Sequence, residues 1–125
     1  MSGKAIIIED DVNSAKVLAH LLLKEGIESI IVTYFGQFQS QNLVDAAIIF
    51  VDLEMPGISG FEVLEVLMRD SQYQSVPIIA SSVHLNEINQ VRDAGFHSFI
   101  GKPLRKDIFP NQLRRILAGE RIWET

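Results

Sequence analysis

The sequence contains no cysteine, only one tryptophan, and no apolar run long enough to cross a membrane. Without cysteine the chain has neither a disulfide framework nor a thiolate metal site, which is typical of a cytoplasmic protein. The apolar stretch nearest the N-terminus, residues 5–8, is too short for a signal peptide or a membrane-spanning helix. We therefore expect a cytoplasmic protein with no membrane association.

Basic residues are scarce relative to acidic ones, 11 against 16, which gives a formal net charge of −5. Proteins that bind nucleic acid directly favour basic faces, so this balance argues against such binding. It is compatible with a cation site and equally with plain solubility. Hydrophobic residues make up 47% of the 125 residues, which is typical of a globular protein. We expect one domain over residues 1–125, with a core at about 4–118.

Short apolar runs typical of strands alternate with segments whose apolar residues recur at helical spacing. The strand-like runs are residues 4–8, 28–33, 47–51, 76–80 and 96–100. Helices are expected at 14–25, 36–45, 59–69, 85–94 and 107–117, with a short tail at 119–125. This order, a strand and then a helix five times over, predicts a parallel sheet with helices on both faces and right-handed crossovers.

Several residues mark the expected helix ends. Asn13 and Asp107 are candidate N-caps, because their side chains can accept hydrogen bonds from free backbone N–H groups. Ser59 with Glu62 three residues later predicts a capping box. Pro110 fits the first turn of the last helix.

Polar residues follow the predicted strands where each one ends. These residues are Glu9, Asp10 and Asp11 after the first strand, Asp52 and Glu54 after the third, Ser81 and Ser82 after the fourth, and Lys102 after the fifth. The carboxyl ends of parallel strands meet at one edge of the sheet, where ligands of α/β proteins bind. Taken singly, each residue has an ordinary structural explanation, such as a helix-start acid or a turn serine. Their convergence is what indicates a site.

The chemistry of this convergence points to a cation and a phosphoryl group. Carboxylates held together raise one another's pKa unless a cation neutralises them. Oxygen ligands without His or Cys suit Mg²⁺ or Mn²⁺. The Lys102 ammonium could supply a point charge for a phosphoryl group, and the Ser82 hydroxyl could donate to one of its oxygens. Phosphoryl transfer depends mainly on positioning and charge neutralisation, so this set of groups is sufficient.

Four motifs make the chain resemble the receiver domain of two-component response regulators. They are IIIEDD (6–11), IIFVDLEMPGISG (48–60), PIIASS (77–82) and AGFHSFIGKPL (94–104), and the resemblance runs from Lys4 to about Leu117. It implies a flavodoxin-like three-layer α/β sandwich. The doubly wound parallel sheet would have five strands in the order 2-1-3-4-5.

The resemblance also implies a role for each matching residue. Asp52 corresponds to the phosphoacceptor, and Lys102 to the lysine that contacts the phosphoryl group. Glu9 and Asp10 correspond to the acidic pair near the metal, with Asp10 a direct ligand, and Glu54 to the position whose backbone carbonyl reaches the metal. The switch residues would be Ser82 and Phe99, and the Lys102–Pro103 bond is expected to be cis.

Two positions depart from the family pattern. Val83 stands where the family usually has a very small residue bordering the phosphoryl site. Its branched side chain is expected to narrow access and slow phosphorylation or dephosphorylation. Phe99 replaces a switch tyrosine and therefore has no hydroxyl to redirect. Neither change removes a group that phosphorylation needs.

The function implied is a phosphorylation-dependent signalling switch rather than a turnover enzyme. A sensor histidine kinase or phosphotransfer protein would donate the phosphoryl group to Asp52 with Mg²⁺ bound. The surface formed by the fourth expected helix (85–94), the fifth strand (96–100) and the fifth helix (107–117) would then be reshaped for an unknown output partner or for a homodimer. Whether the chain stands alone or belongs to a larger regulator is left open.

Three other readings compete with this one. A small metal-dependent phosphohydrolase of the haloacid-dehalogenase type also uses paired acids, but its second acid is Asp where this chain has Glu54. A flavodoxin-like binding module needs a hydroxyl- and glycine-rich loop after the first strand, where EDDVNS (9–14) places acids. A receiver-shaped interaction module that is not phosphorylated has all the residues seen here, and Val83 keeps that alternative open.

Overall fold

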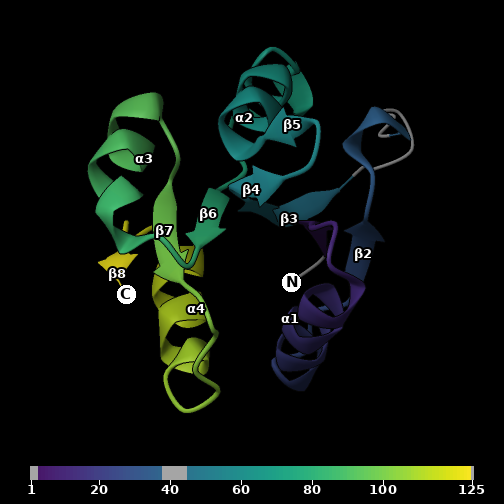
Figure 1. Ribbon diagram of the computed structural model, residues 1–125. Coiled ribbons are helices and arrows are strands. Elements are labelled where there is room, and N and C mark those ends of the chain that lie inside the picture. The colour runs from purple at the N-terminus through teal and green to yellow at the C-terminus, as the bar shows by residue number, and fades with distance from the viewer. Residues whose placement is uncertain (1–2, 38–44, 125) are drawn as a thin grey trace.

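The computed structural model describes residues 3–37 and 45–124, and six strands in this part of the chain form one parallel sheet (Figure 1). Their spatial order is β2-β1-β3-β6-β7-β8. The bounds are β1 Lys4–Ile8, β2 Ser29–Val32, β3 Ala46–Asp52, β6 Ile78–Ser82, β7 Ser98–Gly101 and β8 Trp123–Glu124. A separate antiparallel pair consists of β4 Glu54–Met55 and β5 Ile58–Ser59.

Helices cover both faces of this sheet. The α-helices are α1 Val12–Lys24, α2 Gly60–Met68, α3 Ile88–Ala94 and α4 Phe109–Leu117. The 3-10 turns are η1 Phe35–Gln37, η3 Ser71–Tyr73 and η4 Leu85–Glu87. Within the described residues, no helix is long and apolar enough to cross a membrane.

Two hydrophobic cores lie on opposite faces of the sheet, because neighbouring strand residues point to opposite sides. In β3, Ile48 and Phe50 join the core under α1 and α4, whereas Ile49 and Val51 join the core under α2 and α3. All four are almost fully buried. Strands buried on both faces read as continuous apolar runs, which is why the sequence indicated a covered parallel sheet.

The three-layer α/β fold and the order of its first five parallel strands are confirmed, but the expected strand count is wrong. Residues predicted as a tail contain β8, a sixth strand that pairs in parallel with β7. The backbone N–H of Phe99 donates to the Ile122 carbonyl at 2.8 Å, and Ile122 is 2% exposed. Two residues are too few to show a strand period, so the sequence pattern could not reveal this element.

The helix caps are partly as expected. The capping box of Ser59 and Glu62 is present. The prediction for Asn13 is wrong: α1 begins two residues earlier than expected, and Asp11 is its N-cap, accepting from the Asn13 N–H at 3.1 Å. Asp107 is also not a cap, since Ile108 occupies that position without a side-chain hydrogen bond. Both errors are small shifts in helix start, the least reliable part of such predictions.

The helix expected at 36–45 falls largely on residues 38–44, which lie outside the described residues. Just before them the chain forms η1, and just after them it enters β3.

Candidate acidic site at the carboxyl edge of the sheet

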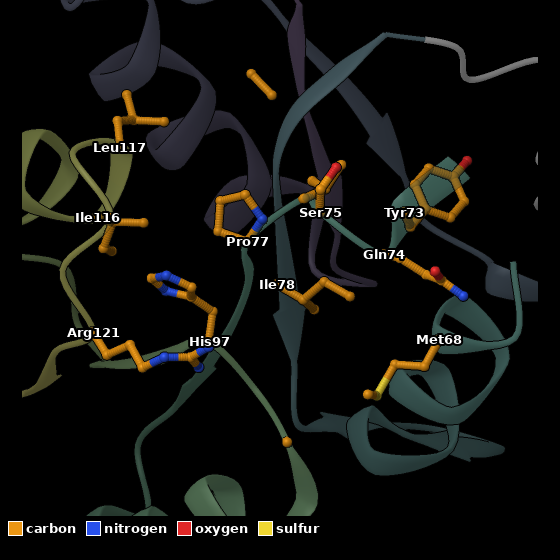
Figure 2. A pocket seen from close by; sticks show the side chains of 14 residues that line it. Met68, Tyr73, Gln74, Ser75, Pro77, Ile78, His97, Ile116, Leu117 and Arg121 are labelled. Atoms are coloured by element: carbon orange, nitrogen blue, oxygen red, sulfur yellow. The ribbon is translucent and has the colours of Figure 1, made fainter. Parts of the chain in front are cut away.

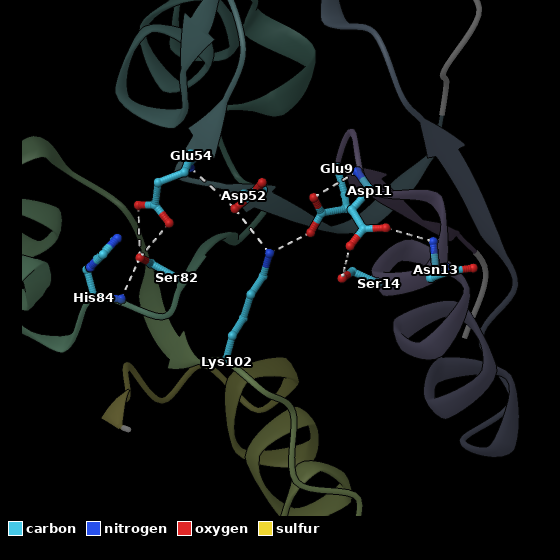
Figure 3. A network of polar contacts seen from close by, with 9 residues as sticks. All are labelled: Glu9, Asp11, Asn13, Ser14, Asp52, Glu54, Ser82, His84 and Lys102. Atoms are coloured by element: carbon cyan, nitrogen blue, oxygen red, sulfur yellow. Dashed lines mark hydrogen bonds and ion pairs between the residues drawn. The ribbon is translucent and has the colours of Figure 1, made fainter.

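Three strands bring acidic and basic side chains to one edge of the sheet. Glu9 and Asp10 follow β1, Asp52 ends β3, and Lys102 follows β7. Each of the three acids offers a carboxylate oxygen, and these oxygens all lie within 4.8 Å of one another. Figure 3 shows the Lys102 side chain extended toward the space between Glu9 and Asp52. The residues that the strand ends were predicted to gather are therefore close together.

Lys102 is the counter-ion of two buried acids. Its Nζ lies 2.5 Å from Glu9 Oε1 and 3.1 Å from Asp52 Oδ1. The side chains of Glu9 and Asp52 are only 7% and 6% exposed, so their charges need such a partner. Burial raises the pKa of Glu9, and the hydrogen bond from Lys102 opposes that rise. Burial alone would lower the pKa of Lys102, but the hydrogen bond to Glu9 and the charge of Asp52 raise it.

The backbone around Asp52 is tightly fixed. Leu53 N–H donates to the Ser81 carbonyl at 3.1 Å, which continues the pairing of β3 with β6. Gly60 packs so closely against this turn that a Cβ atom there would lie 2.8 Å from the Asp52 carbonyl oxygen. Only glycine permits that approach. Asp52 Oδ1 accepts from Lys102 and from the Glu54 N–H at 3.3 Å.

A second pair of carboxylates surrounds the Ser82 hydroxyl. Ser82 Oγ lies 2.9 Å from each Glu54 carboxylate oxygen and 3.1 Å from Glu87 Oε1, and it accepts from the His84 N–H at 2.9 Å (Figure 3). A hydroxyl has one proton, so only one of these carboxylate oxygens receives it at a time. Burial raises the pKa of Glu54; the Ser82 hydroxyl opposes that rise, and Glu87 adds to it.

Sequence reasoning missed this second cluster. Glu87 was not a candidate at all, and the Glu54 side chain was not expected to take part. The available signal was weak: Glu87 lies five residues after Ser82 and in a short 3-10 turn, η4. Its position relative to Glu54 depends on the fold of two separate loops.

A cleft of about 320 Å³ opens beside Asp52 and Lys102. Its floor is formed by the ends of β1 and β3, and its walls by α1 and the loop after β7. Val83 lines it and is 56% exposed, so its side chain borders the site as the sequence indicated. The effect of Val83 on access stays a prediction.

Phe99 lies fully inside the protein at 0% exposure. It pairs with Ala80 of β6 on one side and with Trp123 of β8 on the other. The Lys102–Pro103 peptide bond is cis, as the resemblance implied. Asp11, the third acid after β1, serves as the cap of α1 and bonds Ser14 Oγ at 2.9 Å.

The three clustered acids fit a hard divalent cation. Their ligand atoms are all carboxylate oxygens, and Mg²⁺ prefers one or two carboxylates with water and phosphate completing its shell. Two of the acids are buried, and Asp10 is exposed. The cluster can therefore present both a shielded and a water-accessible side to an ion.

The comparison with protein families agrees with this geometry. A family model described as the response regulator receiver domain matches residues 5–114. That range includes every residue of the acidic site and of the Ser82 cluster.

Curated relatives carry the same kind of segment inside longer proteins. Hybrid signal transduction histidine kinase C of Dictyostelium discoideum is 34% identical over 122 residues, covering 90% of this chain and 10% of that protein. Sensory transduction protein RegX3 of Mycobacterium tuberculosis is 32% identical over 115 residues, covering 90% of this chain and 49% of that protein. The chain thus spans about half or less of these relatives' lengths.

Solved structures share the fold. Chemotaxis protein CheY4 of Vibrio cholerae has a TM-score of 0.82 at 20% identity, covering 93% of this chain and 99% of that one. The receiver domain of sensor histidine kinase PA1611 from Pseudomonas aeruginosa, solved with a magnesium ion in its active site cleft, has a TM-score of 0.78 at 20% identity, covering 95% and 100%.

Proposed function

Because the chain belongs to the response regulator receiver family, we propose that it is a signalling switch controlled by phosphorylation of Asp52. The observation that carries this proposal is the pairing of buried Asp52 with Lys102 beside two further acids at the carboxyl edge of the sheet. Family membership sets the chain among signalling domains rather than turnover enzymes. It therefore argues against the phosphohydrolase and flavin-binding alternatives.

In the proposed reaction Asp52 acts as the nucleophile. A carboxylate oxygen forms a bond to phosphorus, and the bond between phosphorus and the donor's histidine nitrogen breaks, with the electron pair leaving on that nitrogen. Lys102 and the Glu54 N–H both donate to Oδ1, so Oδ2 is the oxygen that we propose attacks phosphorus. The Lys102 ammonium, 3.1 Å from Oδ1, is placed to hold the transferred group.

The acidic residues would hold the divalent ion. Asp10 and Asp52, with Glu9 nearby and the Glu54 backbone carbonyl, would bind Mg²⁺ (or Mn²⁺), which neutralises charge on the phosphoryl oxygens. The ion and Lys102 would share the negative charge of Glu9 and Asp52, which a single ammonium now offsets only in part.

Ser82 and Phe99 would transmit the effect of Asp52 phosphorylation to the rest of the protein. Ser82 now faces Glu54 and Glu87, so its hydroxyl must leave them to donate to a phosphoryl oxygen on Asp52. Phe99 is buried beside the β6 strand that carries Ser82, and a shift of that strand end alters its packing. Such a local charge change biases a two-state element.

The proposal also covers the phosphoryl donor, the extent and location of the domain, and the face for the output partner. A sensor histidine kinase or phosphotransfer protein would supply the phosphoryl group; relatives of this chain include segments of histidine kinases. The receiver is proposed to occupy residues 1–125 as one domain in the cytoplasm, without direct contact to nucleic acid. The output partner is proposed to use the face formed by α3, β7 and α4.

Intact-mass analysis tests the proposal. The protein is incubated with acetyl phosphate with and without Mg²⁺, beside Asp52→Asn and the control Asp93→Asn, an exposed acid on α3. We expect one phosphoryl group on the wild type and on Asp93→Asn only with Mg²⁺, and none on Asp52→Asn. Labelling of Asp52→Asn at the wild-type rate would refute the acceptor. No labelling of the wild type, even by a histidine kinase, would favour an unphosphorylated interaction module.

A further inference from the structure

The C-terminal strap, defined as residues Glu120–Glu124, covers the outer edge of β7. It contains β8, which pairs Trp123 with Phe99 and Glu124 with Ile100. The Ile122 N–H donates to the Ser98 hydroxyl at 2.9 Å. Figure 1 shows β8 beside β7, between α3 and α4. The strap therefore lies on the face through which the output partner is proposed to bind.

Side chains on both neighbouring helices hold the strap. The Trp123 ring lies 5.1 Å from the guanidinium carbon of Arg92 on α3. Arg115 on α4 bonds Glu120 at 2.5 Å and Glu124 at 2.7 Å. Hydrogen bonds to these two carboxylates raise the pKa of Arg115 above its usual value. The strap thus offers an aromatic ring to one cation and a carboxylate to another.

The strap is short, and its attachments are partly buried and partly at the surface. The ladder of the strap has two residue pairs, and the ion pairs of Arg115 are partly exposed. Ile122 is buried, Trp123 packs partly buried against the core, and buried Gln112 donates to Glu124 Oε1 at 3.2 Å. Exposed ion pairs contribute little net stability. An edge strand of this length can therefore leave without unfolding the sheet beneath it.

The strap is hydrogen-bonded directly to Phe99, the proposed switch residue. The Phe99 N–H donates to the Ile122 carbonyl at 2.8 Å, and Phe99 pairs on its other side with Ala80, two residues before Ser82. The Lys102 N–H donates to the Ser82 carbonyl at 2.9 Å, so the end of β7 follows Ser82 as well. A shift at the acidic site thus reaches the strap through one strand.

We propose that the C-terminal strap closes the β7 edge while Asp52 is unphosphorylated and detaches when Asp52 is phosphorylated. This rests on the proposed function. The opened edge then accepts an extended segment of the output partner that carries an aromatic residue followed by a carboxylate. That chemistry is the one that Arg92 and Arg115 already bind in Trp123 and Glu124. Main-chain pairing at a free strand edge supplies the remaining contacts.

The single tryptophan of the chain reports on the strap, because Trp123 lies within it. Trp123 emission and its quenching by acrylamide are measured before and after acetyl phosphate with Mg²⁺, and intact mass is recorded on the same samples. We expect stronger quenching and a red shift in the phosphorylated protein. A mass gain on Asp52 with unchanged quenching would overturn the strap proposal and leave the switch intact. No mass gain with acetyl phosphate, nor with a histidine kinase as donor, would overturn both.

Arg115→Ala tests the strap without phosphorylation, and Arg114→Ala is its matched control. Arg114 lies on the same helix but bonds Glu25 rather than the strap. We expect Arg115→Ala to raise the detached fraction by about two- to five-fold. Coupling is reciprocal, so the equilibrium yield of phosphorylated Asp52 at limiting donor should rise as well. Quenching equal to that of Arg114→Ala would count against the strap.

Discussion

The two ends of the sheet differ in both cavity size and charge. At the carboxyl ends of the strands, the acidic site borders a cleft of about 320 Å³. At the amino ends a larger hollow of about 740 Å³ lies near Pro77, His97 and Arg121 (Figure 2). The larger hollow contains no cluster of acids among the described residues. Cavity size therefore does not locate the chemistry here; the convergence of charged side chains from separate strands does.

The electrostatics of the two ends are opposite. At the carboxyl end burial raises the pKa of Glu9, and a lysine is needed to keep the charge there. At the amino end burial lowers the pKa of His97, and Arg121 lowers it further by repulsion. One end thus holds excess negative charge ready for a cation, whereas at the other end burial and Arg121 both disfavour the charged form of His97.

Lys102→Met should give the largest change in stability, because it removes the only cation paired with Glu9 and Asp52 among the described residues. Breaking a buried ion pair by removing one partner typically costs about 3 kcal/mol. We expect a loss of that order in the free energy of unfolding, measured with urea. Added Mg²⁺ should recover part of it, because the ion would replace the lost charge.

Lys106→Met is the control for this comparison. Lys106 is exposed in the loop before α4, so its removal should leave the urea midpoint nearly unchanged. Equal losses for the two variants would show that Lys102 does not balance the buried acids. A loss that Mg²⁺ cannot reduce would argue against an ion at this edge.

Ser82→Ala should have an intermediate effect. The substitution leaves Glu54 and Glu87 without their shared hydroxyl donor and the His84 N–H without its acceptor. Loss of such hydrogen bonds costs about 1–2 kcal/mol in unfolding free energy. Adding Glu54→Gln should restore part of it, because one of the two repelling carboxylates is then neutral.

Ser81→Ala provides the matched control for Ser82→Ala. Ser81 is the neighbouring residue of β6 and is also buried, at 8% exposure, yet it faces neither Glu54 nor Glu87 through a hydrogen bond. Its substitution should cost less. If Glu54→Gln does not raise the unfolding free energy of Ser82→Ala, repulsion between the Glu54 and Glu87 carboxylates does not measurably destabilise the protein.

What the sequence could predict follows from which features carry a pattern. The buried strands and the acidic edge were predictable because β3 is a continuous apolar run that ends at Asp52. The close approach of the Asp52 backbone to Gly60, which the missing Cβ permits, depends on tertiary packing and has no sequence pattern. The strand of Trp123 and Glu124 was not predictable, because its pairing depends on contacts with distant Arg92 and Arg115.

The side-chain network around Ser82 illustrates the same limit. Its position at the end of β6 follows from the strand pattern, but its partners come from β4 and η4, two short elements distant in sequence from each other. Tertiary packing rather than local propensity brings these side chains together, so Glu87 left only a weak sequence signal. The roles proposed for Asp52, Lys102 and Phe99 come from the family resemblance, and they stay predictions until the phosphorylation experiments are done.

The smallest expected effect lies at the amino end and concerns pH. The folded-state pKa of His97 is below its ordinary value of 6.5, first through burial and then through Arg121. Between the folded-state pKa and pH 6.5, the unfolded chain therefore binds more protons at His97 than the folded protein does. The stability that neutral His97 contributes above pH 6.5 is lost as the pH falls through the folded-state pKa. His97→Gln should remove this part of the pH dependence in urea unfolding, whereas His20→Gln, at an exposed position of α1, should retain it.

Arg121→Gln should raise the His97 pKa measured by NMR titration, but only in part, because the burial that contributes most remains. An unchanged His97 titration in Arg121→Gln would mean that the cations at this end do not repel, and the electrostatic contrast between the two ends would then rest on the acids alone.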